Sequence, residues 1–134
     1  MNKEKLFFWV LRIAVAGEFI GHGVFALQRK EGWFKYFHPF GITNSETITA
    51  LLLMVGVIDV ALAILILIKP VRIALLWMAV WGLWTAMIRW PFGPDPIWDF
   101  VERWANWGAP LALLLAYGWP KNLKEWFYGS KSVS

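Results

Sequence analysis

The sequence contains no cysteine, only two histidines and few charged residues. Without thiols, the chain cannot form a dithiol relay, a zinc site with cysteine ligands or a cysteine-held iron–sulfur cluster. Its charged fraction is 16%, whereas about 25% is usual for a soluble domain. The glycine loop that binds phosphate and the short motifs of serine hydrolases and zinc proteases are also absent. The sequence therefore signals neither a hydrolase nor a nucleotide enzyme, and whether the chain is an enzyme stays open.

Apolar residues dominate, since 59% of the 134 residues are hydrophobic and 18% are aromatic. A soluble domain of this size has too little interior to bury such a share. The net charge is +4, but the basic residues occur singly or in pairs and form no stripe of the kind that binds nucleic acid. A membrane surface is the better partner for this charge. We therefore predict an all-α integral membrane protein that contacts lipid and no nucleic acid.

Four apolar stretches are long enough to suggest membrane spans. The second stretch, residues 48–68, would cover about 31 Å as a helix, which is about the thickness of a bilayer core. We predict one transmembrane four-helix bundle over residues 1–128 and a flexible tail at 129–134. The expected spans are residues 6–27, 48–68, 71–90 and 104–119.

The basic residues of the loops predict the orientation. Four spans place both termini and the turn at residues 69–70 on the same side of the membrane. That side carries seven lysine or arginine residues, and the opposite side carries five. Because cytoplasmic loops carry the excess of these residues, we expect a multi-pass protein of the cell (inner) membrane with both termini in the cytoplasm.

Aromatic residues gather between the first two spans. The segment 28–47 holds Trp33, Phe34, Tyr36, Phe37 and Phe40. This composition favours a short helix or re-entrant turn in the membrane interface over a free loop. The sequence thus predicts an interfacial aromatic segment between helices 1 and 2.

Three tryptophans, at positions 77, 81 and 84, lie inside the third stretch at helical spacing. We interpret them as lipid-facing or packing bulk. Stacking on a ligand is the alternative.

Polar side chains inside the predicted spans are the best guide to function. An ionisable group at that depth costs several kcal/mol unless it is paired, so it marks a functional site by default. Glu18 and His22 lie one helical turn apart on one face, and Asp59 lies near the middle of the second stretch. The candidate residues for ligand binding or proton handling are Glu18, His22, Asp59, Thr85, Arg89, Glu102 and Asn106.

These residues predict a polar cavity that opens toward the outer side. At 1.5 Å per residue, His22 would lie about 8 Å, Glu18 about 14 Å and Asp59 about 17 Å below the outer surface. A cavity narrowing toward the two carboxylates would accept a quinone ring or a lipid headgroup, with Arg89 and Glu102 at its mouth. The alternative is structural: Arg89 and Glu102 clamp two helices, and the buried carboxyls are protonated packing groups.

A metal or haem site has less support. His22 and His38 both lie toward the outer side and are the only histidines that could ligate a haem. Neither has a second histidine four residues away, and no covalent haem-attachment motif is present. We therefore expect no metal site.

Several short motifs resemble the DoxX-like family of small four-helix integral membrane proteins. The motifs are the run RIAVAGEFIGHG at 12–23, Gly56-x-x-Asp59, Pro70-x-Arg72-x-Ala74 and Glu102-Arg103-Trp104-x-Asn106.

The resemblance implies a small membrane subunit with a redox or stress function, since the family takes its name from subunits associated with thiosulfate:quinone oxidoreductase. A quinone or similar amphipathic ligand is then the expected ligand, and a redox protein partner would supply the electron-transfer centre. The alternatives are a non-enzymatic scaffold, chaperone or assembly factor, and third a haem-binding or transport role. A homo-oligomer is compatible with each of these.

Overall fold

The computed structural model describes residues 1–128, and the predicted flexible tail at 129–134 lies outside the described residues. Within the described range the chain forms six α-helices, two short 3-10 helices (η) and no strand, which confirms the all-α prediction. In chain order these are α1 (Lys3–Leu27), η1 (Glu31–Tyr36), η2 (His38–Phe40), α2 (Ser45–Ile68), α3 (Arg72–Met87), α4 (Ile97–Val101), α5 (Trp104–Ala116) and α6 (Leu123–Phe127).

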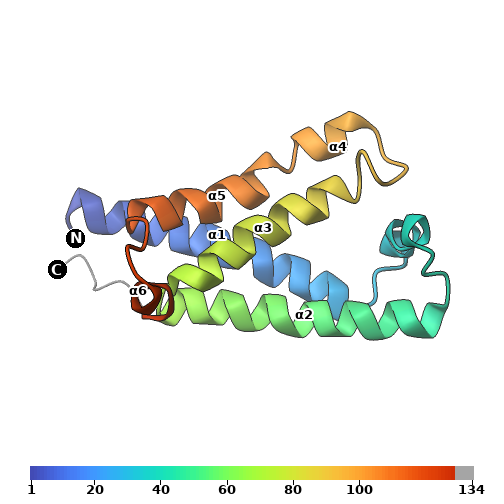
Figure 1. Ribbon diagram of the computed structural model, residues 1–134, viewed down its shortest axis with the longest axis horizontal. Helices are drawn as coiled ribbons and strands as arrows, with labels where there is room; N and C mark the ends of the chain where they lie inside the picture. Colours follow the sequence, from blue (N-terminus) through green and yellow to red (C-terminus); the bar gives the residue numbers. More distant parts are fainter. Residues whose placement is uncertain (129–134) are drawn as a thin grey trace.

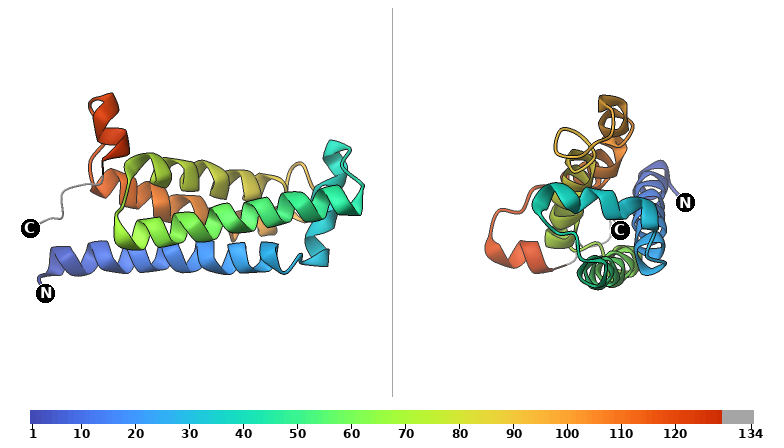
Figure 2. Two further views of the ribbon diagram at one scale, coloured as in Figure 1. Left: turned by 90° about the horizontal axis from the view of Figure 1, so that it is seen from below. Right: turned by 90° about the vertical axis from the view of Figure 1, so that its right-hand side faces the viewer.

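Four of the helices, α1, α2, α3 and α5, run lengthwise through an elongated molecule (Figures 1 and 2). Helix α1 packs along α2, α3 packs along α5, and α1 also contacts α5. By contrast, α2 and α3 touch little and diverge from the tight turn that joins them (Figure 1). The start of α1 and helix α6 lie at one end, and η1, η2 and α4 lie at the other.

Asparagine side chains begin the two longest helices. The Asn2 side chain accepts a hydrogen bond from the Lys5 N–H, and the Asn44 side chain accepts one from the Thr47 N–H. Each bond satisfies an N–H that has no partner within the helix. The helices therefore begin about one turn before the apolar stretches that predicted them, because the cap and the first turn are polar.

The third and fourth predicted spans are shorter in the structure than the sequence indicated. Helix α3 ends at Met87, three residues before the predicted end, because the chain turns ahead of Pro91. Helix α5 ends at Ala116, and a turn at Glu102 separates it from α4. By length and composition, only α1 and α2 qualify as candidate membrane-crossing helices among residues 1–128.

Arginines bind the carbonyl ends of helices at the end of the molecule opposite η1. The Arg12 guanidinium donates to the carbonyls of Ile66 (3.0 Å) and Leu67 in the last turn of α2. The Arg72 guanidinium donates to the carbonyl of Tyr117, just after α5, at 2.7 Å. Both satisfy carbonyls left without a helical partner and place positive charge at the negative end of a helix dipole.

Contact between α3 and α5 depends on a glycine that faces a proline-disrupted turn. Pro110 has no N–H, so the carbonyl of Asn106, four residues earlier, lacks its helical donor. A Cβ added at Gly82 would lie 2.5 Å from that carbonyl oxygen. Only glycine lets the two backbones approach this closely, and the approach holds α3 against α5 beneath the cavity described next.

Candidate ligand cavity

A cavity of about 280 Å³ lies where α2 and α3 diverge, and the η1–η2 segment forms one of its walls. Its lining is mainly apolar and aromatic. The exposed side chains of Met54 on α2 and Trp84 on α3 contribute to it, so the cavity reaches the outer surface of the bundle between these helices. The lining residues are His22, Trp33, Tyr36, Phe37, Phe40, Ile42, Leu51, Leu52, Met54, Val55, Trp81, Trp84, Thr85, Ile88 and Arg89.

The sequence prediction anticipated His22 and Asp59 as polar residues of the site, and the structure brings them together. His22 Nδ1 lies 3.4 Å from Asp59 Oδ2. The Asp59 side chain is 1% exposed, and its Oδ1 has no hydrogen-bond partner among the described residues. The His22 ring also packs against the Trp33 ring, with centroids 4.7 Å apart and the ring planes tilted by 35°. Asp59 and Trp33 thus fix the orientation of an imidazole that lines the cavity.

Glu18 lies beside the main cavity. It lines a smaller pocket that shares His22, Trp81 and Thr85 with the larger one. The Thr85 hydroxyl donates to the Gly82 carbonyl at 3.0 Å, so its oxygen is still able to accept a hydrogen bond.

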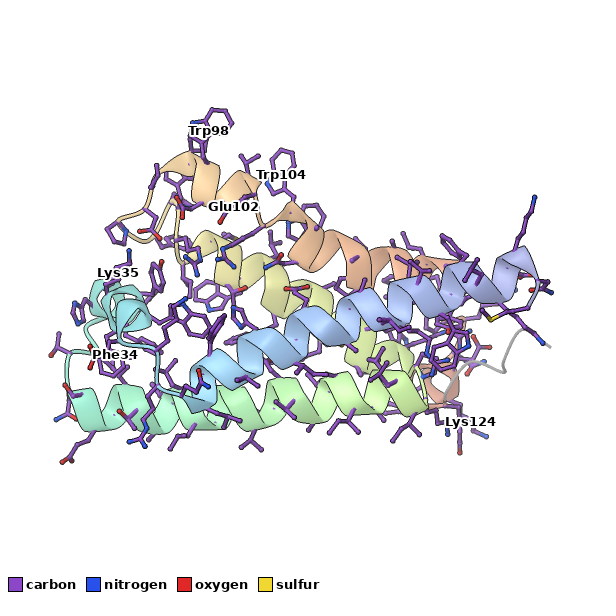
Figure 3. All side chains as sticks on the ribbon, turned by 180° about the vertical axis from the view of Figure 1, so that it is seen from behind. Phe34, Lys35, Trp98, Glu102, Trp104 and Lys124 are labelled. Carbon is purple, nitrogen blue, oxygen red and sulfur yellow. The ribbon has the colours of Figure 1, made fainter. Side chains whose placement is uncertain are left out.

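A network of four side chains ties η1 to the loop after α3. The Tyr36 hydroxyl donates to Asp95 Oδ2 at 2.5 Å and accepts from Arg89 Nη1 at 2.7 Å. Lys35 Nζ donates to Asp95 Oδ1 at 2.7 Å. Lys35 lies on the side of η1 that faces this loop (Figure 3). Tyr36 and Arg89 therefore belong both to the network and to the cavity wall.

Charge and burial set the protonation of this network. Partial burial raises the pKa of Asp95, but the hydrogen bonds from Lys35 and Tyr36 and the charge of Arg89 outweigh it, and the net result is a lowered pKa. Burial, followed by the bond to Asp95, raises the pKa of Tyr36. At neutral pH, Asp95 is thus an ionised acceptor and Tyr36 a protonated donor.

Glu102 and Asn106, which we expected near the cavity mouth, do not line either pocket. The Glu102 side chain is 64% exposed, and its ion-pair partner is its neighbour Arg103, at 3.9 Å. The clamp between Arg89 and Glu102, which was the structural alternative, is not formed, because Arg89 contacts Tyr36 and Asp95 instead. The reason is local: Glu102 lies in the turn that ends α4, where its side chain stays exposed to the surroundings.

The network around Asp95 was missed at the sequence level. Asp95 lies between two prolines in a loop, and neither helical spacing nor depth links it to Tyr36, which is 59 residues away. The only available signal was Pro94-Asp95-Pro96 itself, a rigid loop segment that presents one carboxylate.

The two histidines occupy different environments. His22 lines the cavity, whereas His38 is exposed at the start of η2 and does not line it. Within residues 1–128, no group of three or more histidine, aspartate or glutamate side chains is arranged to hold a metal ion. The arrangement can hold an apolar body of moderate size and give it polar contacts at His22, Thr85 and Arg89.

Comparison with protein-family models, curated proteins and solved structures produced no match. The resemblance to the DoxX-like family therefore stays a prediction, and the geometry of the cavity is the basis on which the function is argued.

Proposed function

We propose that the chain is a four-pass integral membrane protein that binds an amphipathic ring-bearing ligand, of the quinone class, in the cavity between α2 and α3. The single observation that carries the proposal is this cavity: mainly apolar, about 280 Å³ in volume, and lined by a few polar side chains. Ligand sites in proteins combine these features.

The apolar outer surface supports the placement in a membrane. In the most apolar 18-residue window of α1, and likewise of α2, only 28% of the residues are buried, whereas a soluble core helix would be mostly buried. Val10 and Val57 are 58% and 61% exposed. Exposed apolar surfaces of this kind have to be covered by lipid or by another protein. Helices α3 and α5 are short, but they run beside α1 and α2 and would cross with them in a locally thinned bilayer (Figure 2).

The position of the cavity supports a lipid-soluble ligand. It reaches the bundle surface between two helices, past Met54 and Trp84, rather than only at the polar end. A ligand dissolved in the bilayer would enter there sideways, and its chain would stay among the lipids. The polar part would meet His22, which Asp59 orients.

In this proposal His22 handles hydrogen bonds or protons of the ligand, with Asp59 as its positioning residue and Glu18 as a neighbouring carboxyl. The excess of basic residues supports cytoplasmic termini in an inner membrane, so that η1 and η2 face the outer side. Electron transfer would require a partner protein, because the side chains of this sequence supply no redox centre of their own.

A binding experiment with two histidine variants tests the proposal. Decyl-benzoquinone is titrated into the detergent-purified protein, and quenching of tryptophan fluorescence reports binding beside Trp33, Trp81 and Trp84. We expect saturable quenching that His22→Ala weakens about tenfold and His38→Ala leaves unchanged. Glu18→Gln is expected to weaken binding less than His22→Ala. Quenching that does not saturate, or that both histidine variants leave unchanged, would contradict the proposal.

One observation favours a second candidate, a scaffold or assembly factor. Gly17 and Gly21 on α1 are exposed, and a Cβ added at either would meet nothing within 4 Å. Small residues spaced this way let another transmembrane helix approach closely. Gly17→Leu would then abolish co-purification of a membrane partner while leaving quinone binding intact, whereas a ligand-binding role alone predicts no such loss.

A further inference from the structure

The direction of the hydrogen bonds around Tyr36 limits what the ligand can present at the η1 end of the cavity. The Asp95 carboxylate can only accept, so the Tyr36 O–H must donate to it. The Arg89 guanidinium can only donate, so the Tyr36 oxygen accepts from it. The single proton of Tyr36 is therefore committed, and this hydroxyl has none to offer a ligand.

Arg89 is the remaining polar group at this end of the cavity. Its side chain is only 11% exposed, and its Nη1 is used by Tyr36 and lies 3.5 Å from Asp95. No hydrogen bond is formed by its Nε or Nη2 within residues 1–128, although a guanidinium has five N–H donors. The cavity wall contains no carboxylate that would compete for them. The η1 end thus offers donors and a positive charge.

We infer that the cavity selects an amphiphile whose head accepts hydrogen bonds, that is, a carboxylate or a quinone carbonyl. Arg89 binds this head, and the apolar chain of the ligand leaves the cavity between α2 and α3. Asp95 acts as a positioning residue, because it orders Tyr36 and through it Arg89. This inference deepens the proposed function and rests on it. A hydroxyl head of the same size could accept a hydrogen bond from Arg89, but its own proton would find no acceptor at this end, and its bond to the guanidinium would lack the strength that a charged acceptor gives.

The chemistry of arginine makes this selection sizeable. Hydrogen bonds from a guanidinium to a carboxylate are charge-assisted and are about twice as strong as neutral ones. They gain further strength in an apolar cavity, where water screens them less. We therefore expect a carboxylate head to bind about tenfold or more tightly than a hydroxyl head on the same chain.

Matched probes separate the head from the chain. The probes 2-bromododecanoate and 2-bromododecanol share chain and bromine, and the bromine, which lies beside the head inside the cavity, quenches tryptophans such as Trp81 and Trp84 in the cavity wall. Decyl-benzoquinone is the third probe, which distinguishes a carbonyl from a carboxylate head. Each is titrated into the wild-type protein in an uncharged detergent at pH 7.5.

Two variants then identify the residue responsible. Arg89→Gln removes the charge from the cavity wall, and Arg103→Gln removes an equal charge from a residue outside it. We expect Arg89→Gln to abolish the preference for an acceptor head, and Arg103→Gln to preserve it. Asp95→Asn is expected to reduce the preference without abolishing it.

The outcomes distinguish the inference from the proposal beneath it. If decyl-benzoquinone and both bromododecyl probes fail to bind, the proposed function itself fails. The inference is wrong if the alcohol binds as tightly as the acid and the quinone, or if Arg89→Gln leaves the preference for an acceptor head unchanged. In either case the cavity binds amphiphiles, but Arg89 does not select their head. Circular dichroism of Arg89→Gln confirms that the variant is folded.

Discussion

Gly23 of α1 and Gly56 of α2 lie directly against each other where the two helices pack. A Cβ added at Gly56 would come within 2.8 Å of the Gly23 carbonyl oxygen, and one added at Gly23 within 3.0 Å of the Gly56 carbonyl oxygen. These contacts are with backbone, which cannot rotate away. The pair lies next to Asp59 along α2, so the close approach also sets the distance between His22 and Asp59.

Substitution at this contact should cost stability. We expect Gly56→Ala to lower the free energy of unfolding by about 1–3 kcal/mol through overpacking, although alanine is the better helix former. The measurement is thermal unfolding in detergent. Gly17→Ala is the matched control, because it adds the same methyl group to a helical glycine with open space around it. An equal effect of both substitutions would show that the contact is not tight.

The contrast between these glycines shows what the sequence could predict. The four-residue spacing of Gly17 and Gly21 is typical of a helix-contact face, but spacing alone does not tell which face of α1 meets α2. The contact is made by Gly23, which is buried, whereas Gly17 and Gly21 are exposed. Local patterns thus predicted the helices well, and they could not predict which faces pack, because packing depends on all the helices together.

The residues of the site also divide into those that the sequence could predict and those that it could not. His22 and Asp59 were predictable because charged groups within apolar stretches stand out in the sequence, and both lie deep within long helices. The contact of Tyr36 with Asp95 joins η1 to the loop after α3, and neither a single short 3-10 helix nor a loop has a periodic signature in the sequence. The alternative that paired Arg89 with Glu102 was wrong for this reason: Glu102 is near in depth, but the turn before α5 leaves it exposed.

The Asp95 network should make the stability of the fold depend on pH in the acid range. Because folding lowers the pKa of Asp95, the ionised carboxylate stabilises the fold above its ordinary pKa, about 3.9, and this contribution disappears as pH falls through the lower folded value. We expect the wild-type melting temperature to fall more steeply than that of Asp95→Asn between about pH 5 and pH 2. At pH 7 the variant should melt a few degrees lower.

Asp99→Asn is the control for this measurement, since Asp99 is in the neighbouring helix α4 and belongs to none of the network contacts. Its melting curve should keep the acid dependence of the wild type. Parallel curves for the wild type and Asp95→Asn would contradict the role of Asp95.

Arg12 should stabilise the opposite end of the bundle. Its guanidinium donates to the carbonyls of Ile66 and Leu67, which would otherwise lack a partner at the end of α2. We expect Arg12→Met to cost about 1–3 kcal/mol in unfolding free energy. Lys5→Met also removes a positive charge from α1, but Lys5 donates no side-chain hydrogen bond among the described residues, so it should cost far less. Equal losses would assign the effect to charge alone.

The lack of cysteine makes the predicted topology directly testable. A single cysteine introduced by Glu31→Cys reports the η1 end, and one introduced by Lys121→Cys reports the end where α6 lies, and both positions are exposed. Since the sequence has no other thiol, any labelling by a membrane-impermeant maleimide belongs to the new position. We expect labelling of Glu31→Cys in intact cells, and of Lys121→Cys only after the membrane is permeabilised.

The reverse labelling pattern would show that the orientation is inverted. Labelling of both positions in intact cells would show that the two ends of the bundle lie on the same side of the membrane. In that case the cavity between α2 and α3 would not face lipid in the way that the proposed function requires.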